Sequence, residues 1–238
     1  MERISKVIAN SGYASRRKVD ELISLGKVMV NGEKATLGQK IDSSDIITID
    51  GKIIEKNSGN FEYYILNKPR GVISTSSDEK GRKTIVDLIN TKTRIYPVGR
   101  LDYDTTGAIL LTNDGELTNK LLHPSKMIDK VYLAKVRGII TGFEINKLKN
   151  GIKIDNYKTS PARVKLKSFD KKTNTSMVLL TIYEGHNHEV KKMFETIGYD
   201  VIKLTRLSFA GIDVKSLKSG EYRKLTIKEV QKLYSMVK

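Results

Sequence analysis

Cysteine is absent from this chain of 238 residues. Its absence excludes disulfides, thiolate metal sites, iron–sulfur clusters and a cysteine nucleophile, and it fits a reducing compartment. Long apolar runs are missing as well: no apolar stretch approaches the roughly 18 residues of a membrane span, and residues 1–10 hold none long enough for a signal peptide. We therefore expect a cytoplasmic protein with no membrane partner.

Acidic side chains are few, because 27 Asp and Glu face 43 Lys and Arg and leave a formal net charge of +16. Such an excess favours a polyanionic partner. The excess is uneven, since residues 1–58 carry 10 basic and 8 acidic side chains and residues 59–238 carry 33 and 19. The second part is therefore expected to supply most of the long-range attraction to a phosphate backbone.

The first part of the chain predicts a small, helix-rich domain. Its expected elements are two helices and two strands: residues 3–9, 15–25, 27–30 and 46–49. The strands end in the tight-turn dipeptides Asn31-Gly32 and Asp50-Gly51. The polar stretch 57–60 lacks periodicity and predicts a linker, which divides the chain into domains 1–58 and 59–238.

Strand-like runs dominate the second part and alternate with helical stretches. The expected strands are residues 63–67, 71–75, 108–112, 130–136, 163–168, 177–183 and 201–209. The expected helices are residues 84–89, 116–122, 142–149, 188–197 and 227–234. This pattern predicts an α+β fold with a mainly antiparallel mixed sheet flanked by helices.

A polar loop between Gly99 and Gly107 is the most unusual segment of the sequence. It leads into an apolar run, and a loop bracketed by glycines in that position is a rigid place to hold a carboxylate. An Asp among apolar walls beside a fixed cation can act as a nucleophile or a base. Residue chemistry alone does not say which of Asp102, Asp104 and Asp114 is the better catalytic candidate. For each of them, a carboxylate that caps a turn is the commoner interpretation.

Two histidines raise a metal hypothesis. His186 and His188 lie near Glu184 and Glu189, and His-x-His on a strand would put both imidazoles on one face. The chain has only three histidines and no cysteine to complete a site. We therefore expect surface or RNA-contacting histidines and no metal.

A basic triplet, Arg16, Arg17 and Lys18, stands near the start of the second expected helix. It can face phosphates, although a merely solvated helix face is the commoner meaning of such a cluster.

Five motifs in order carry a family resemblance. They are Lys68-Pro69-Arg70-Gly71-Val72, Gly99-Arg100-Leu101-Asp102, Leu122-His123-Pro124 with Lys130-Val131-Tyr132, the run from Glu184 to Phe194, and Leu204-Thr205-Arg206. With these motifs the chain resembles the pseudouridine synthases of the RsuA/RluB type over essentially its whole length. Residues 1–56 resemble the alpha-L RNA-binding domain of ribosomal protein S-four.

The resemblance implies a reaction and a set of roles. It implies isomerisation of a uridine to pseudouridine in ribosomal RNA, with no cofactor. Asp102 would attack the nucleoside or remove a ribose proton, Tyr132 would stack on the target base, and Lys191 would pair with Asp102. The family usually has Arg where this chain has Lys191, which keeps the charge and loses the bidentate fork. The implied RNA-binding residues are Arg16, Arg17, Lys18, Lys68, Arg100, His188, Lys192 and Arg206.

The expected partner is a structured stem-loop whose target uridine is flipped out of its stack, bound by a monomer. The sequences of residues 100–105 and 219–225 are more similar to the family's large-subunit branch, so we expect large-subunit ribosomal RNA to be the substrate. A small-subunit synthase and a non-catalytic RNA-binding or ribosome-assembly factor remain alternatives. A DNA-binding protein would rest on the charge and the helix pair alone.

Overall fold

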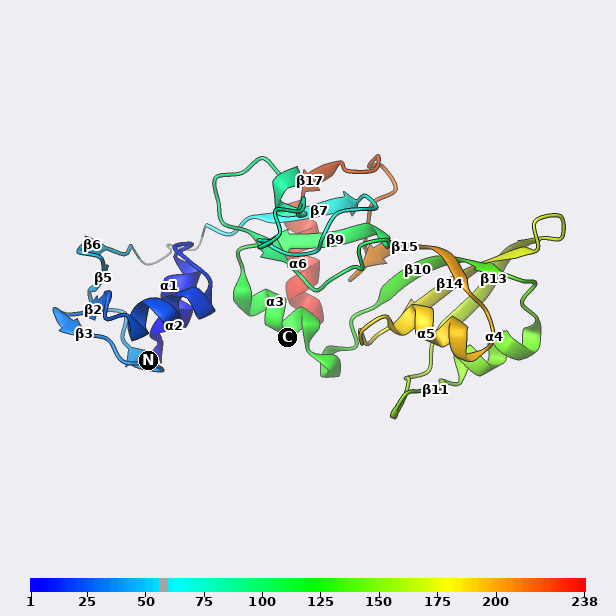
Figure 1. The fold of residues 1–238 in the computed structure, drawn as a ribbon, viewed down its shortest axis with the longest axis horizontal. Helices are drawn as coiled ribbons and strands as arrows, with labels where there is room; N and C mark the ends of the chain where they lie inside the picture. Colours follow the sequence, from blue (N-terminus) through cyan, green and yellow to red (C-terminus); the bar gives the residue numbers. More distant parts are fainter. Residues whose placement is uncertain (56–59) are drawn as a thin grey trace. The chain divides into compact units, whose positions relative to one another are not determined.

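The computed structural model describes residues 1–55 and 60–238 and divides into two compact units (Figure 1). The first unit is Met1–Glu62 with two short segments, Thr91–Arg94 and Asn113–Gly115, and the second is the remainder. Residues 57–59 of the predicted linker lie outside the described residues. Among the residues described, no helix has the length and apolarity to cross a bilayer.

The first unit joins two helices to short antiparallel strands. Its elements are β1 (Glu2–Arg3), α1 (Ile4–Asn10), α2 (Arg16–Ser24), β2 (Val28–Val30), β3 (Glu33–Lys34), β4 (Lys40–Ile41), β5 (Ile47–Ile49) and β6 (Lys52–Ile53). The order β3-β2-β5-β6 forms one sheet, and β1 pairs with β4. Both dipeptide turns have positive φ at each residue, 53° and 88° at Asn31-Gly32 and 49° and 76° at Asp50-Gly51. Two-residue hairpins require this conformation, which is why the sequence signal was correct here.

Helix α2 begins and packs for reasons visible in the sequence. The hydroxyl oxygen of Ser15 accepts a hydrogen bond from the backbone N–H of Lys18 at 3.2 Å, which caps the helix. Val19, Leu22 and Ile23 share one face at helical spacing and are buried in the core of this unit.

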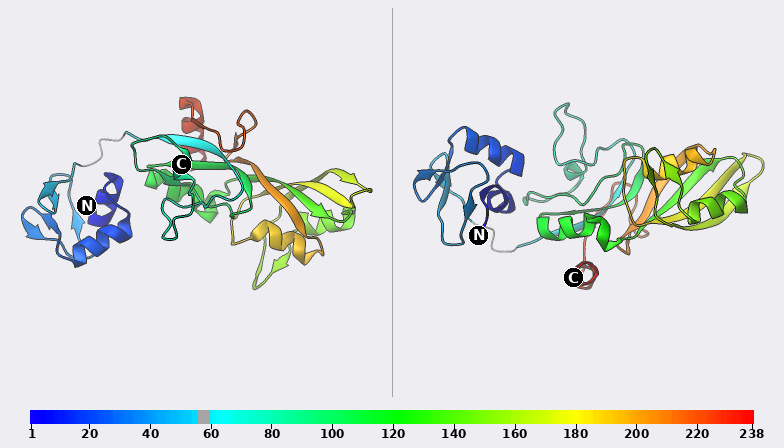
Figure 2. Two further views of the ribbon diagram at one scale, coloured as in Figure 1. Left: turned by 45° about the horizontal axis from the view of Figure 1, so that its top comes forward. Right: turned by 90° about the horizontal axis from the view of Figure 1, so that it is seen from below.

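The second unit is built on a nine-stranded sheet. Its path is β13-β14-β10-β15-β9-β7-β17, with β16 beside β15 and β8 beside β9. The strands are β7 (Tyr63–Lys68), β8 (Tyr96–Pro97), β9 (Thr106–Thr112), β10 (Lys130–Arg137), β13 (Arg163–Asp170), β14 (Thr175–Ile182), β15 (Val201–Phe209), β16 (Ile212–Asp213) and β17 (Tyr222–Lys224). All pairs are antiparallel except β15 with β9, where the long orange strand of Figures 1 and 2 lies between β10 and β9. The predicted fold class is confirmed.

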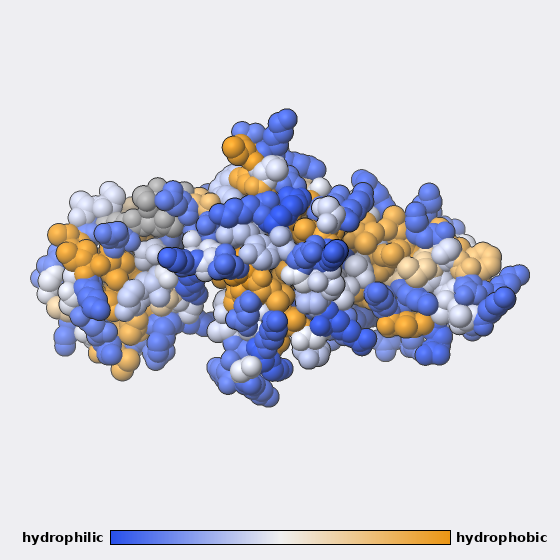
Figure 3. Space-filling model, turned by 90° about the horizontal axis from the view of Figure 1, so that it is seen from above, coloured by the Kyte–Doolittle hydropathy of each residue, from blue (hydrophilic) through white to orange (hydrophobic). Residues whose placement is uncertain are grey.

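Helices cover this sheet on two faces. They are α3 (Gly115–Leu122), α4 (Gly142–Lys149), α5 (Glu189–Thr196) and α6 (Ile227–Met236), and a separate hairpin joins β11 (Lys153–Ile154) to β12 (Tyr157–Lys158). Successive residues of β7 and β9 alternate between two apolar cores, because strand side chains point to opposite faces. One core includes side chains of α4 and α5, and the other includes those of α3 and α6. Hydrophilic side chains project from the face drawn in Figure 3, with apolar patches between them.

Two predicted elements of the second unit are wrong. Residues 71–75 form no strand beyond an isolated bridge between Ile73 and Thr84, and their polar groups bind the nearby loop instead. Residues 84–89 contain only a 3-10 turn, Val86–Leu88. There the Asp87 carboxylate accepts from the backbone N–H and hydroxyl of Thr84, while Ile85 and Ile89 are buried.

Gly107 allows β9 and β15 to approach closely. Its φ is +105°, and a Cβ at this position would lie 2.1 Å from the carbonyl oxygen of Arg206. Residue 107 pairs with Lys68 on β7 and with Arg206 on β15, so the contact lies in the middle of the sheet.

We expect Gly107→Ala to lower the free energy of unfolding by about 3 kcal/mol or more, because it combines backbone strain with an overlap against main chain. Urea denaturation followed by circular dichroism measures the change. Gly142→Ala is the matched control, because Gly142 opens α4 and an added methyl meets open space. It should be neutral or stabilising by up to about 1 kcal/mol. Equal stability of the two variants would contradict the role given to Gly107.

Candidate active site

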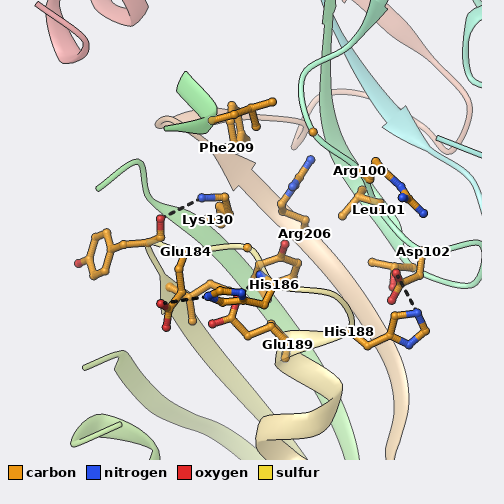
Figure 4. Close-up of a pocket in the computed structure, with 18 of the residues that line it drawn as sticks. Arg100, Leu101, Asp102, Lys130, Glu184, His186, His188, Glu189, Arg206 and Phe209 are labelled. Carbon is orange, nitrogen blue, oxygen red and sulfur yellow. Dashed lines mark hydrogen bonds and ion pairs between the residues drawn. The ribbon is translucent and has the colours of Figure 1, made fainter. Parts of the chain in front are cut away.

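A cavity of about 470 Å³ opens in the second unit (Figure 4). The loop before β9, the strands β10 and β15, and the loop before α5 supply its walls. This volume is in the range of pockets that hold small organic ligands. The polar and charged side chains that line it include Arg100, Asp102, His123, Lys130, Tyr132, Glu184, His186, His188, Glu189, Lys191 and Arg206.

A row of paired residues crosses the sheet, and two of its members, Tyr132 and Arg206, line this cavity. Lys68 pairs with Gly107, Gly107 with Arg206, and Arg206 with Tyr132. Directly paired residues on neighbouring strands point to the same face of a sheet. The register therefore brings side chains from three distant sequence segments to one place.

Lys68 holds the loop that carries Asp102. Its ammonium donates hydrogen bonds to the carbonyl oxygens of Asp102 at 3.0 Å and Thr105 at 2.9 Å, with Pro69 and Tyr103 at 3.2 and 3.5 Å. Ser74 adds a second support, because its hydroxyl donates to the Leu101 carbonyl at 2.7 Å and accepts from the Leu101 N–H at 3.1 Å. The hydrogen bonds from Lys68 and Ser74 therefore fix the backbone of residues 101–105.

The predicted RNA contact of Lys68 is wrong in this arrangement. Its side chain is fully buried, and its ammonium faces loop carbonyls rather than solvent. Burial lowers the pKa of Lys68 to about 8, while the charges of Asp104 and Asp102 oppose that shift. Lys68 acts on the site through the loop.

The Asp102 carboxylate lies between two nitrogen-bearing side chains of the α5 region. Its Oδ2 is 3.2 Å from Lys191 Nζ. Its Oδ1 is 3.7 Å from His188 Nε2 (Figure 4). Lys191 also donates to Asp104 at 2.6 Å, so one ammonium serves two carboxylates. Burial alone would lower the pKa of Lys191, but hydrogen bonds to Asp104 and Asp102 outweigh it and raise that pKa. The hydrogen bond from Lys191 also lowers the pKa of Asp104.

Tyr132 lies on β10 and is 7% exposed, with its side chain in the cavity wall. Leu204 on β15 lines the same cavity. A planar ring with a polar tip beside an aliphatic side chain gives a surface on which a flat heterocycle can stack.

The other side of the cavity holds acids and cations, of which Glu189 and Lys130 are buried and Glu184 is half-buried. Glu184 accepts from the backbone N–H of Ser160 at 2.6 Å, and Glu189 accepts from that of His186 at 2.9 Å. Burial raises the pKa of Glu189 to about 8, and the neighbouring Glu184 carboxyl adds to the shift. Burial likewise lowers the pKa of Lys130 to about 8.

The two histidines point to different partners. His186 Nε2 is 3.8 Å from Glu184, whereas His188 faces Asp102, and both lie on the loop before α5 rather than on a strand. Within residues 1–55 and 60–238, no three His, Cys, Asp or Glu side chains are grouped so that they could hold a metal ion. The geometry required by the metal hypothesis is therefore not present in the described part of the chain.

The remaining predicted RNA-binding residues lie in three different parts of the structure. Arg100 and Arg206 line the cavity, the first exposed and the second buried. Lys192 pairs with Asp155 at 2.5 Å on the hairpin β11–β12. Arg16, Arg17 and Lys18 are exposed on α2 of the first unit, where Lys18 also pairs with Glu21. Their contacts with RNA stay predictions.

Comparison with known proteins gives two family matches. The model of the RNA pseudouridylate synthase family matches residues 62–196, and the S4 domain matches residues 2–47. The first match spans more than half of the chain. The chain belongs to the RNA pseudouridylate synthase family.

Relatives of this synthase cover its whole length. It is 51% identical to ribosomal large subunit pseudouridine synthase B of Bacillus subtilis, over 99% of this chain and 97% of that protein. It is 35% identical to the dual-specificity RNA pseudouridine synthase RluF of Escherichia coli K12, over 99% of this chain and 79% of that protein. A crystal structure of a pseudouridylate synthase matches 98% of this chain and 100% of its own, with a TM-score of 0.69 and 30% identity. The synthase activity inferred from the motifs is confirmed.

Sequence reasoning missed several residues that shape the cavity of this synthase. The sequence predicts no role for Ser74, and it includes Lys130 only within the motif Lys130-Val131-Tyr132. Ser74 and Lys130 donate to main-chain carbonyls, and Glu189 is buried beside a second acid. One signal was available: Glu184 and Glu189 were noted beside the histidines, although only as metal ligands. Main-chain partners leave no pattern in side-chain spacing.

Glu189 predicts a pH dependence of stability. Between about pH 4.5 and 8 the folded protein keeps a proton on Glu189 that the unfolded chain has lost, so this group lowers stability as pH rises through that window. Glu189→Gln removes the contribution, and we expect the variant to gain stability relative to the unsubstituted protein from pH 5 to pH 8. Urea denaturation at several pH values measures it. The control is Glu195→Gln, an exposed glutamate on the same helix, and parallel profiles for Glu189→Gln would contradict the prediction.

Proposed function

We propose that Asp102 is the catalytic carboxylate of this synthase and that it acts on a uridine flipped into the cavity. The observation that carries the proposal is its position. The side chain is 28% exposed, lies 3.2 Å from the ammonium of Lys191, and lines a cavity of about 470 Å³. A carboxylate held by a cation stays ionised and oriented, as a nucleophile or base requires.

Tyr132 and Lys191 complete the proposed machinery. The Tyr132 ring stacks on the uracil, a contact that favours a flipped-out base. Lys191 holds Asp102 in place and shares its charge with Asp104. Both carboxylates bind one point-like ammonium, so the Lys at this position can perform the pairing without a guanidinium fork.

We propose large-subunit ribosomal RNA as the substrate. The similarity to a protein named ribosomal large subunit pseudouridine synthase B, at 51% identity over nearly the full length of both chains, supports this choice. The S4 match at residues 2–47 and the exposed residues Arg16, Arg17 and Lys18 support an RNA contact by the first domain. The charge of residues 59–238 supports a second, less specific contact with the backbone.

We further propose that residues 1–58 and 59–238 are separate domains of a cytoplasmic monomer that needs no cofactor. The first unit has an apolar core of its own, which supports the division. The reaction rearranges bonds within one nucleoside and consumes nothing, which supports the absence of a cofactor.

Asp102→Asn should abolish isomerisation and leave folding and RNA affinity intact, because the change is nearly isosteric and removes the charge. Tritium release from RNA labelled at uridine C5 measures the reaction. Asp104→Asn is the control, since Asp104 also binds Lys191 but does not line the cavity, and its loss should stay within about tenfold. Activity of Asp102→Asn within about tenfold of the unsubstituted enzyme, a loss of only ~1.4 kcal/mol, would refute the assignment.

The purified enzyme should modify one uridine in protein-poor large-subunit RNA and none in small-subunit RNA. Electrostatic attraction is common to all RNA, so the choice of one site depends on a stem-loop that offers a uridine at low unstacking cost. Mapping pseudouridines in both RNAs after incubation measures the outcome. A new pseudouridine in small-subunit RNA would overturn the substrate and leave the reaction class unchanged.

A further inference from the structure

Arg206 presents an unsatisfied positive group at the cavity. The residue is 2% exposed, and its Nε donates to the Ala108 carbonyl at 2.7 Å. Its Nη2 is buried and has no hydrogen-bond partner among the described residues. Lys130 is the neighbouring cation, and both side chains lie over the ring of Phe209, at 5.1 Å for Arg206 and 5.7 Å for Lys130 (Figure 4).

A purely structural role accounts for only part of this arrangement. The bond from Nε to Ala108 ties β15 to β9, and a neutral donor could make it. A buried charged donor without an acceptor is destabilising, and a partner that accepts a hydrogen bond from it offsets that cost. Asp102 does not supply one, because its carboxylate faces Lys191 and His188. The cavity that Arg206 lines is where a partner can enter.

The reaction creates a group that fits this position. When the bond between ribose C1′ and uracil N1 breaks, the bonding electrons leave with the base, and the negative charge spreads over N1, O2 and O4. The deficiency at C1′ is met by the Asp102 carboxylate, or by a ribose double bond if Asp102 takes the C2′ proton. We propose that Arg206, with Lys130 beside it, stabilises the uracil as it departs as an anion and holds it in the cavity.

A fixed cation can stabilise the negative charge of the uracil both before and after the ring rotates. Rotation about the axis through N3 and C6 exchanges N1 with C5 and O2 with O4, so an oxygen that shares the charge occupies the same place in both orientations. The electron pair then forms the bond from C5 to C1′ as the Asp102 carboxylate leaves C1′, or as Asp102 returns the proton to C2′ of the ribose double bond. The proton on C5 is then lost, and N1 gains a proton. Electrostatic stabilisation of charge that develops in the transition state accelerates a reaction more than it tightens substrate binding.

The test compares two leaving groups in single-turnover reactions at saturating RNA. One RNA carries uridine at the target and the other 5-fluorouridine, whose fluorine stabilises the uracil anion without help from the protein. Loss of the original nucleoside is scored, because fluorine cannot leave C5 as a proton does. We expect Arg206→Gln to slow the uridine reaction by about 100-fold or more at unchanged RNA affinity. Its effect on the 5-fluorouridine RNA should be at least tenfold smaller, and Arg206→Lys should recover much of the uridine rate.

An equal slowing of both RNAs by Arg206→Gln would overturn the inference, because a structural defect does not distinguish leaving groups. If Arg206→Gln fails to fold, Lys130→Met carries the same comparison with the same two outcomes. The inference rests on the proposed placement of the uridine beside Asp102, and Asp102→Asn separates the two. An inactive Asp102→Asn with equal slowing refutes only the role of Arg206, whereas an active Asp102→Asn refutes the proposed function.

Discussion

The buried ammonium of Lys68 is the interaction on which the rest of the site depends. It satisfies carbonyl oxygens of the loop at Asp102 and Thr105 from a position that water does not reach. A loop of this kind has few backbone partners of its own, and unsatisfied buried carbonyls are costly. One cation at the end of β7 thus fixes the backbone from which the Asp102 side chain extends, and Lys191 binds the other end of that side chain.

The acidic and basic side chains of the site are placed so that their charges do not fully neutralise one another. Asp102 and Asp104 share Lys191 at one side, while Glu184 and Glu189 accept from backbone N–H groups at the other. Burial keeps a proton on Glu189 near neutral pH. The cations Lys130 and Arg206 therefore have no fully ionised acid pair beside them, and the positive potential in this part of the cavity remains available to a ligand.

Local rules predicted most of the elements, and long-range pairing decided the rest. The hairpin turns at Asn31-Gly32 and Asp50-Gly51 follow from backbone conformations that few residues adopt, so sequence alone identifies them. The prediction of a strand at residues 71–75 was wrong because polar groups of this segment bind a loop about 30 residues further along the chain. Asp102 could be selected among three aspartates only through the family motif, and the burial of Lys68 could not be read from a motif in which lysine was expected to contact RNA.

The parallel pairing of β9 with β15 also dictates when the cavity can exist. Thr106 pairs with Thr205 and Gly107 with Arg206, so segments about 100 residues apart in the chain must meet before the floor is complete. Contacts of such long sequence separation form slowly, because a large loop has to close first. During synthesis the loop with Asp102 emerges long before its partners on α5 and β15. The floor of the cavity is therefore completed only after β15 has left the ribosome, late in the synthesis of the chain.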